Sequence, residues 1–310
     1  MKISYFFLIF LIFQLFFIAC RVDGCTDPLS LSYNKNANHG DNSCTYPERI
    51  NRAIIFKKTS TRYSPTNPNY DLLYDWENYL TSTYGENLNL LNVHFNYQPN
   101  GGVLQNDQFY TTFNDSLLDF LLYSSTLSSN IIYNYDWFLA NFSMFNFQNP
   151  LFYSSITEKI DTLLNRDVKV AIALEYSTIN NVMDIKVQCQ RYNYDSEDYN
   201  LSIYIMEDNI VSTVYNGITV VNSNFIFNNI FREEITKFSS SSWSSFTVPY
   251  GSYGVIGSNV EFTDNKLLKK YSVELENNWN SSNCYPIAVI WKRNESLNTC
   301  EYLNSVSGKN

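Results

Sequence analysis

The spacing of apolar residues changes near residue 167 and divides the chain into two parts. Before that point, short apolar runs alternate with stretches whose apolar residues recur three and four positions apart, the spacing of an amphipathic helix. Strands alternating with helices predict a small sheet with crossover helices. The predicted strands cover 53–56, 88–95 and 131–133, and the predicted helices cover 72–80, 117–122 and 150–164.

After residue 167 the pattern predicts strands alone. Apolar residues alternate with polar ones over 168–174 and again over 182–187, with Asn180 and Asn181 as the turn between them. Such strands, separated by turn residues at fairly regular spacing, are typical of an antiparallel β-sandwich of the immunoglobulin-like type. The other predicted strands cover 201–206, 211–215, 225–231, 271–275 and 287–291. We therefore predict an α+β protein of two domains, 48–166 and 167–310.

Residues 1–19 form an almost unbroken apolar segment that ends just before Cys20. Lys2, the apolar run and the small residue Ala19 are the parts of a cleavable signal peptide. A cysteine directly after the cut is typical of a bacterial lipoprotein, so we predict lipidation at Cys20. Two alternatives remain. The first is an ordinary secretory signal, because Phe17 stands where lipoprotein cleavage motifs usually have Leu. The second is an uncleaved membrane anchor, which the length disfavours because the apolar run is shorter than the roughly 20 residues of a span.

Composition excludes several kinds of chemistry. The formal net charge is −9 and no basic patch is visible, which argues against nucleic acid as a partner and against anionic lipid for the body of the protein. His39 and His94 are the two histidines and lie in different regions, which disfavours a catalytic triad or a histidine metal site. We predict no metal and no cofactor. The abundance of Tyr and Phe fits either AT-rich codon usage or a functional aromatic surface.

Residues 20–47 are too polar to form a core. Cys25 and Cys44 predict a disulfide in an oxidising compartment, worth roughly 3 kcal/mol through loop closure. We predict a stalk or linker here. Oxygen donors at near-alternate positions suit either a calcium site or a stapled polar stalk, and they are Asp27, Asn34, Asn36, Asn38 and Asp41.

The stretches 24–28 and 43–47 read GCTDP and SCTYP, with a Tyr-Asn pair between them. They resemble a short cysteine-bounded motif of surface and secreted proteins of marine Bacteroidota. The chain departs from that motif in the middle, at His39 and Gly40. The resemblance implies an extracytoplasmic protein.

Four phrases of the second half resemble the outer membrane protein 28 family of Bacteroidota. They cover 167–176, 205–211, 227–232 and 279–290. The whole resemblance spans about residues 50–305. It implies a surface lipoprotein with a thioredoxin-like α/β domain at 48–166 and an immunoglobulin-like sandwich at 167–310, of a family regarded as adhesins or receptors.

The chain departs from this family where a thioredoxin-like CxxCP motif follows the first strand. Tyr63 and Thr66 stand at the two cysteine positions, and neither supplies an attacking or a resolving thiol. The segment 127–131 has no proline where a thioredoxin fold places a cis-proline. We therefore predict that redox catalysis is lost.

Three cysteines remain if those of the N-terminal segment are lipidated or paired. Cys284 and Cys300 bracket the predicted strand 287–291, and we predict that they pair across a loop. Cys189 would then be free and buried. Pairing of Cys189 with either of the other two is an open alternative.

Two further groups of residues suggest a ligand or an activity. Trp243, Tyr250 and Tyr253 lie in a Ser/Gly-rich loop and form a possible carbohydrate platform, because sugars stack on exposed aromatic rings. The alternative is that Trp243 packs beneath its own loop. Glu207 and Asp208 are adjacent on a strand and point to opposite faces, so they do not form a glycosidase pair.

We predict a non-catalytic binding or adhesion module, anchored by lipid to the outer membrane and exposed on the cell surface. Its partner would be an extracellular protein or glycan. A periplasm-facing envelope scaffold is one alternative, because Arg21-Val22-Asp23 carries a single acid after the lipidation site. An enzyme is the other, either carbohydrate-active or a degenerate thiol oxidoreductase.

Overall fold

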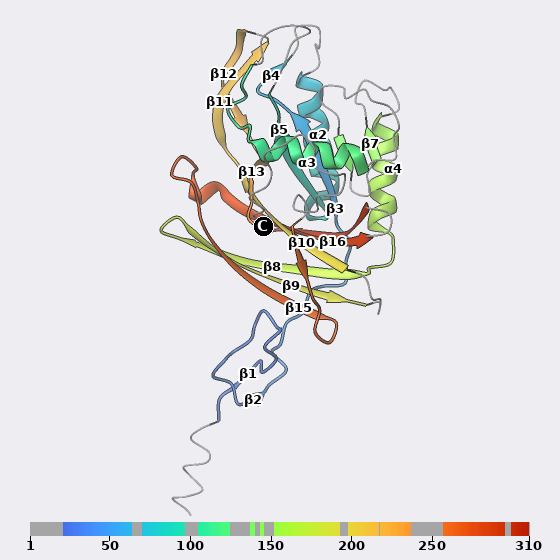
Figure 1. Ribbon diagram of the computed structural model, residues 1–310, viewed down its shortest axis with the longest axis vertical. Coiled ribbons are helices and arrows are strands. Elements are labelled where there is room, and N and C mark those ends of the chain that lie inside the picture. Colours follow the sequence, from blue (N-terminus) through green and yellow to red (C-terminus); the bar gives the residue numbers. More distant parts are fainter. Residues whose placement is uncertain are drawn as a thin grey trace, which may run out of the picture.

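The computed structural model describes residues in ten ranges. They are 21–63, 70–96, 105–124, 137–139, 143–145, 152–192, 198–216, 218–236, 257–294 and 299–309. A helix-containing half lies above a β-sandwich, and the cysteine-bounded N-terminal segment extends below the sandwich (Figure 1). Within these ranges no helix has the length and apolar character needed to cross a membrane.

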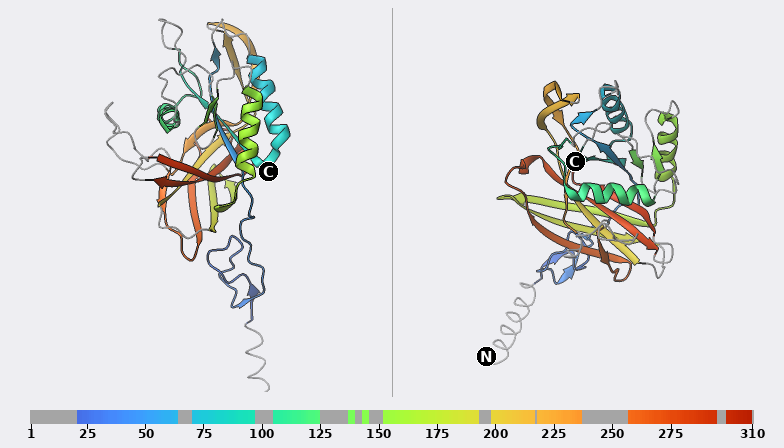
Figure 2. Two further views of the ribbon diagram at one scale, coloured as in Figure 1. Left: turned by 90° about the vertical axis from the view of Figure 1, so that its right-hand side faces the viewer. Right: turned by 45° about the horizontal axis from the view of Figure 1, so that its top comes forward.

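The first half is a thioredoxin-like α/β unit. β3 and β5 pair in parallel, β6 pairs antiparallel with β3, and β7 pairs antiparallel with β6. Helices α2 and α4 lie side by side on one face of these strands, and α3 lies on the other (Figure 2). The elements are β3 (Ala53–Thr59), α2 (Tyr70–Tyr84), η1 (Gly85–Asn87), β5 (Leu88–His94), α3 (Thr112–Ser124), β6 (Trp137–Leu139), β7 (Ser143–Phe145) and α4 (Phe152–Leu164).

The three predicted helices are all present, and so are the strands predicted at 53–56 and 88–95. The strand predicted at 131–133 lies outside the described residues. β6 and β7 follow it at positions where the apolar pattern predicted no strand, because three residues are too few to show a period of two.

The second half contains a sandwich of two sheets. One sheet has the order β15-β9-β8, and the other contains β17, β16 and β10 with β14 beside β10. The predicted turn between β8 and β9 is confirmed, since Asn180 and Asn181 both have positive φ, at 52° and 63°. The strands are β8 (Val170–Ile179), β9 (Val182–Arg191), β10 (Asp198–Glu207), β14 (Ser258–Val260), β15 (Lys266–Glu274), β16 (Cys284–Asn294) and β17 (Thr299–Ser307).

A smaller sheet extends from the top of the molecule in Figure 1. Its order is β12-β11-β4, and β4 (Arg62–Tyr63) joins it in parallel from the first half. The strand predicted at 225–231 is wrong in one respect: β12 ends at Phe227 and a new strand begins at Ile230. The positive φ of Asn229, 54°, turns the chain between them. The strands concerned are β11 (Ile210–Asn216), β12 (Thr219–Phe227) and β13 (Ile230–Glu234).

The two halves share one sheet. Among the described residues nine strands form it, with the order β17-β16-β10-β13-β5-β3-β6-β7 and β14 alongside. The junction is the parallel pair β13–β5, whose register joins Ile230 to Asn92. Residues 165–167 therefore mark the point where the chain changes from alternating strands and helices to strands alone. The hydrogen bonding of the shared sheet nevertheless continues from one half into the other.

Alternation along the strands fills cores on both faces of the shared sheet. On β3, Ile54 and Phe56 face the core beneath α3, whereas Ala53 and Ile55 face the core beneath α2 and α4. The other core lies between the two sheets of the sandwich. Phe56 is fully buried, and burial of one such side chain contributes about 1.5–3 kcal/mol, so these cores fix the relative position of the two halves.

The N-terminal segment is docked on the sandwich. Lys266 Nζ of β15 lies 2.6 Å from Asp27 Oδ2, and Gln188 Nε2 of β9 donates to Leu29 O at 2.5 Å. Burial alone would raise the pKa of Asp27, but hydrogen bonds from Lys266 and Tyr46 outweigh it and lower the pKa to about 2. The ion pair therefore persists at neutral pH. The segment contains β1 (Asp23–Gly24) and β2 (His39–Gly40).

Candidate functional site

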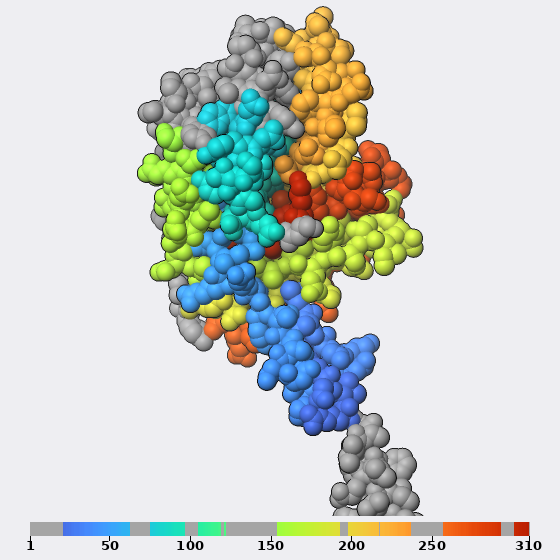
Figure 3. Space-filling model, turned by 180° about the vertical axis from the view of Figure 1, so that it is seen from behind, coloured from blue at the N-terminus to red at the C-terminus, as the bar shows by residue number. Residues whose placement is uncertain are grey.

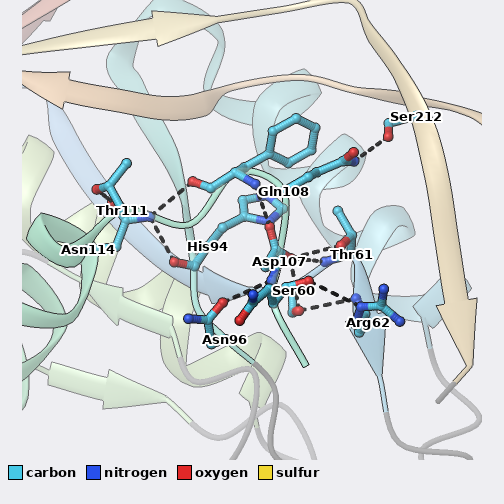
Figure 4. Close-up of polar contacts among 12 residues, drawn as sticks. Ser60, Thr61, Arg62, His94, Asn96, Asp107, Gln108, Thr111, Asn114 and Ser212 are labelled. Atoms are coloured by element: carbon cyan, nitrogen blue, oxygen red, sulfur yellow. Dashed lines mark hydrogen bonds and ion pairs between the residues drawn. The ribbon is translucent and has the colours of Figure 1, made fainter. Parts of the chain in front are cut away.

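A polar cluster lies where β3 and β5 end. Ser60 and Thr61 follow β3, His94 is the last residue of β5, and Asp107 precedes α3. We call these four residues the Asp107 cluster (Figure 4). The carboxyl ends of parallel strands are where α/β sheets usually bind ligands, and the loop after the first strand is where the redox motif of the resembled family would lie.

Asp107 is the centre of the cluster. Its Oδ1 lies 3.1 Å from His94 Nδ1 and accepts from the Phe109 N–H at 2.8 Å. Its Oδ2 accepts from Ser60 Oγ and Thr61 Oγ1, both at 2.9 Å, and from the Thr61 N–H at 2.5 Å (Figure 4). Both carboxylate oxygens are therefore fully used within the protein.

Burial alone would raise the pKa of Asp107. The attraction of His94, together with hydrogen bonds from His94 and from the N–H groups of Phe109 and Thr61, outweighs burial and lowers that pKa to about 2. Asp107 is therefore ionised at neutral pH. Its charge is held in place by five donors from three segments of the chain.

The Asp107 cluster lacks the geometry of a catalytic triad. Ser60 donates to Asp107 and not to His94, and the His94 side chain is 0% exposed. His94 Nε2 has no hydrogen-bond partner among the described residues, and the imidazole packs against the ring of Phe109 at a centroid distance of 4.9 Å. A triad needs the serine on the imidazole and a substrate beside it. The cluster therefore closes this end of the sheet.

The predicted lost redox positions lie beside this cluster in sequence. The backbone of Tyr63 pairs with Asn216 in the β4–β11 register. The Tyr63 side chain and the whole of Thr66 lie outside the described residues, as does the segment 127–131. No peptide bond of the described residues is cis.

A second polar region is a cavity of about 390 Å³ beside β5. We call it the β5 cavity. Its walls come from both halves: α2 and η1 on one side, and the 228–229 turn with the ends of β16 and β17 on the other. Figure 3 shows α2, in cyan, next to the C-terminal residues, in red, on the face where the cavity lies.

One wall of the β5 cavity is a buried charge network around Glu77. Its Oε2 lies 2.6 Å from Lys57 Nζ, and its Oε1 accepts from Asn92 Nδ2 and Asn229 Nδ2, both at 3.1 Å. Burial alone would raise the pKa of Glu77, but the charge of Lys57 outweighs it, so the pKa is lowered. Glu77 is thus ionised and satisfied by these contacts.

The opposite wall is fixed by Lys309, which follows β17. Its Nζ lies 2.5 Å from Asp208 Oδ2 and donates to Asn229 Oδ1 at 2.9 Å. Tyr285 donates its hydroxyl to the same Asn229 oxygen at 2.9 Å, and Lys309 lies over the Tyr285 ring at 5.4 Å. These contacts hold the end of the chain against the 228–229 turn.

Arg52 is the remaining cation that lines the β5 cavity. It directly precedes β3, and its backbone N–H donates to Asn304 Oδ1 at 3.0 Å. Its guanidinium is half-buried, and burial lowers its pKa. Within the described residues that guanidinium has no hydrogen bond or ion pair. A guanidinium can bind a carboxylate through two parallel hydrogen bonds.

The predicted Cys25–Cys44 disulfide is confirmed. The predicted Cys284–Cys300 disulfide is wrong. Cys300 lies opposite Arg293 in the β16–β17 register, nine positions from Cys284 along β16, or roughly 30 Å at the rise of a strand. A disulfide needs Cα atoms within about 7 Å. Sequence proximity misled here because the two cysteines lie at opposite ends of a hairpin.

Cys284 and Cys189 are both free and buried. Burial raises the pKa of the Cys284 thiol to about 12 and also raises the pKa of the Cys189 thiol. Both thiols therefore stay protonated at neutral pH. The expectation that Cys189 is free and buried on its strand is confirmed.

Other predicted sites are resolved only in part. Cys20 and the aromatic platform of Trp243, Tyr250 and Tyr253 lie outside the described residues. Glu207 is bound by Arg232, with Nη2 to Oε2 at 2.6 Å, and accepts from the backbone N–H of residue 280 at 2.8 Å, so it is a structural carboxylate. In the described ranges no three His, Cys, Asp or Glu side chains group as a metal site.

The oxygen donors of the N-terminal segment are engaged in local hydrogen bonds. Four of the five side chains accept a bond from a backbone N–H two residues away or in another part of the segment, which favours the stapled polar stalk over the calcium site. The pairs are Asp27 with Leu29, Asn34 with Asn36, Asn38 with Val22, and Asp41 with Ser43.

The residues that the sequence did not single out are Asp107, Arg52 and Asn229. Asn229 had one usable signal, the Asn228-Asn229 pair inside a predicted strand, because adjacent asparagines favour a turn. Arg52 stands directly before an apolar strand, a weak sign of a cation near the sheet. The spacing between His94 and Asp107 in the sequence matches no motif, so it does not indicate their contact.

Comparison with known proteins adds one finding on the fold. No protein-family model and no curated protein matches the chain. Among solved structures the chain is similar to HBP35 of Porphyromonas gingivalis, one of the Bacteroidota, with a TM-score of 0.59 at 12% identity, covering 84% of this chain and 76% of that chain. HBP35 has a thioredoxin-like domain and a β domain, so the predicted fold class is confirmed. The resemblance to the outer membrane protein 28 family remains a prediction.

Proposed function

We propose that the protein is a lipid-anchored envelope protein that binds an extracellular protein or glycan and carries no catalytic activity. The observation that carries this proposal is the Asp107 cluster. At the end of the sheet where the redox chemistry of a thioredoxin-like domain would take place, Ser60, His94 and Asp107 are buried and bonded to one another or to their neighbours. A closed cluster of this kind serves stability, not substrate turnover.

The thiols of the chain support the same proposal. Dithiol exchange needs one thiolate to attack and a second thiol to resolve the mixed disulfide. Tyr63 and Thr66 replace both at the matching positions. Cys189 and Cys284 are buried with raised pKa values, which disfavours their reaction with a protein substrate.

The β5 cavity supports binding. Ligand sites lie preferentially where two structural units meet, and this cavity has walls from both halves. Its volume of about 390 Å³ lies within the range of small-molecule and short-peptide sites. Charged networks fixed by Glu77 and Lys309 preform its shape.

The location in the envelope is supported by the N-terminal segment. Cys20 follows an apolar segment with the parts of a signal peptide, and the Cys25–Cys44 disulfide suits an oxidising compartment. This segment lies at the end of the molecule opposite the thioredoxin-like half (Figure 1). A lipid on Cys20 would therefore leave the sandwich between the membrane and the thioredoxin-like half.

The direct test is metabolic labelling with a clickable fatty acid, comparing the wild type with Cys20→Ala, followed by protease shaving of intact cells. We expect label on the wild type, no label on the variant, and cleavage of the wild-type protein at the surface. Label that persists in the variant would overturn the lipid anchor. Labelled protein that resists the protease would replace surface binding with a role as a periplasm-facing scaffold.

A further inference from the structure

The edge of β5 that lines the β5 cavity lacks a strand partner over most of its length. On its other edge β5 pairs with β3 along all seven residues. On the cavity side the described strands pair with it at one position, Asn92 opposite Ile230, where the Asn92 N–H donates to Asn229 O at 2.7 Å. β13 begins at this position, and the preceding residues of β5, 88–90, line the cavity.

The peptide groups of Leu90 point into this gap. Alternate residues of a strand direct their N–H and C=O groups to the same edge, so those of Leu88 and Leu90 share the edge used by Asn92. The Leu88 N–H is already bound to Gly85 O at the end of η1. The N–H and C=O groups of Leu90 remain to pair with an incoming chain, because an open strand edge is a template for one.

The walls of the cavity limit what enters it. α2 lies on one side of the β5 edge and the ends of β16 and β17 lie on the other, so a single extended segment fits where a second sheet does not. Three residues of extended chain span roughly 10 Å, which equals the stretch of β5 from Leu88 to Leu91. Short peptides are therefore the occupants that the edge and the volume both suit.

Charge selects which end of a peptide is bound. Arg52 precedes Ala53, which lies opposite Leu88, so its guanidinium is at the amino end of the open edge. The other charged groups of the lining are paired, as Glu77 and Lys309 are, or exposed to solvent, as Glu86 is. The charge of Glu86 acts on Arg52 without an ion pair between them. A guanidinium presents donors in a fork that matches a carboxylate.

We propose that the β5 cavity binds the carboxyl-terminal end of an extended peptide. The terminal carboxylate lies on Arg52, and the main chain of the peptide pairs with the N–H and C=O of Leu90, running antiparallel to β5. This mode combines strand addition with capture of a terminal carboxylate. The inference rests on the proposed binding function and names the class of ligand for it.

Calorimetric titration of the full-length chain tests the inference with three probes: N-acetyl-trialanine, the same peptide as its carboxamide, and acetate. We expect the acid to bind about tenfold or more tightly than the amide, because a hydrogen bond to a charged group contributes about 1.5–3 kcal/mol. Acetate should bind about tenfold or more weakly than the acid peptide, because it makes no contact with Leu90.

Two variants at Arg52 and a control at Arg49 assign the effect to Arg52. Arg52→Gln should reduce the affinity for the acid to that for the amide and leave the affinity for the amide unchanged, a result that misfolding does not produce. Arg49→Gln is the matched control, since Arg49 lies over the Tyr192 ring and does not line the cavity; both affinities should stay as in the wild type. Arg52→Lys, which keeps charge but loses the fork, should give an intermediate preference.

Equal affinity for acid and amide would overturn the role of Arg52, and equal affinity for acetate and the acid peptide would overturn strand addition. No binding of any probe would overturn the whole inference. That last result leaves the lipid-anchored envelope role to the labelling experiment, which does not depend on this cavity. If Arg52→Gln fails to fold, the ratio of the affinities for acid and amide, measured on the wild type and on Arg52→Lys, still tests the role of Arg52.

Discussion

The Asp107 cluster and the β5 cavity are both polar regions at the margins of the same β3–β5 pair, but they use their polar groups in opposite ways. In the cluster, the Asp107 carboxylate is surrounded by donors from the protein itself. In the cavity, Arg52 and Leu90 are lining residues, and the described strands leave the cavity-side edge of β5 unpaired at Leu90. A group satisfied inside the fold contributes to stability, whereas a group left for a ligand contributes to binding.

Strand pairing explains the difference. The end of β5 is closed by the segment that carries Asp107, which returns across Ser60 and Thr61 before α3. The side of β5 stays open over its first residues because β13 begins at Ile230, opposite Asn92, and pairs with β10 on its other edge. The turn at Asn229 sets where β13 begins, so the shared sheet and the cavity have the same origin.

The largest effect should come from removing the centre of the closed cluster. Asp107→Ala leaves His94, Ser60 and Thr61 without their acceptor inside the protein, and we expect a loss of about 3–5 kcal/mol in the free energy of unfolding. Urea unfolding measures it. Asp115→Ala is the matched control, because Asp115 is exposed and bonded to Tyr110, and it should lose less than about 1 kcal/mol. Equal losses would contradict a special role for the cluster.

Substitution of Glu77 tests whether the buried network in the wall of the β5 cavity contributes as much stability as the Asp107 cluster. Glu77→Gln removes the buried carboxylate charge that lies 2.6 Å from Lys57 Nζ, so we expect a loss of about 3 kcal/mol in the free energy of unfolding. Glu86→Gln, at an exposed position of the same cavity, should change it by less than about 0.5 kcal/mol. A small loss for Glu77→Gln in urea unfolding would mean that solvent enters the cavity and screens the pair.

Acid should weaken the cluster over a defined pH range. The pKa of Asp107 is about 2 in the folded protein against a reference of 3.8, so its contribution is present above about pH 4 and is lost as pH falls toward 2. The contribution is about 2 kcal/mol. Asp107→Asn should remove this part of the pH dependence of urea unfolding. A variant with the same pH dependence as the wild type would contradict the assignment to Asp107.

The smallest effect should come from the docked N-terminal segment. Lys266→Met removes the contact with Asp27 at the surface, where an ion pair contributes about 0–1 kcal/mol, and should leave the unfolding of the body unchanged. The segment should then be cut faster by a protease. Lys269→Met, at an exposed position on the same strand, is the control. Equal cleavage of both variants would show that the Lys266–Asp27 contact is not needed to hold the segment.

Local patterns were predictable from the sequence, and long-range contacts were not. The helices of the first half and the Asn180-Asn181 turn follow from spacing and turn residues. The thioredoxin-like character came from a resemblance, because apolar periodicity gives no strand order. The Cys284–Cys300 prediction failed for the same reason: the register of a hairpin separates cysteines that lie close in sequence.

The same division between local patterns and long-range contacts applies to the site residues. His94 was noticed because histidine is rare in this chain, but its partner Asp107 lies in a polar stretch with no period. Arg52 gains its meaning from the shared sheet, which brings β17 and the 228–229 turn beside the start of β5. No single segment of sequence contains that arrangement.

Hydrogen–deuterium exchange of the full-length chain, with and without N-acetyl-trialanine, tests the contrast between the two regions most directly. The account predicts slower exchange over 85–92 and 304–309 when the peptide is present. It predicts slow exchange, unchanged by the peptide, over 59–61 and 105–110. Protection that appears at 59–61 and 105–110 instead, or at neither region, would contradict a closed Asp107 cluster beside an open β5 edge.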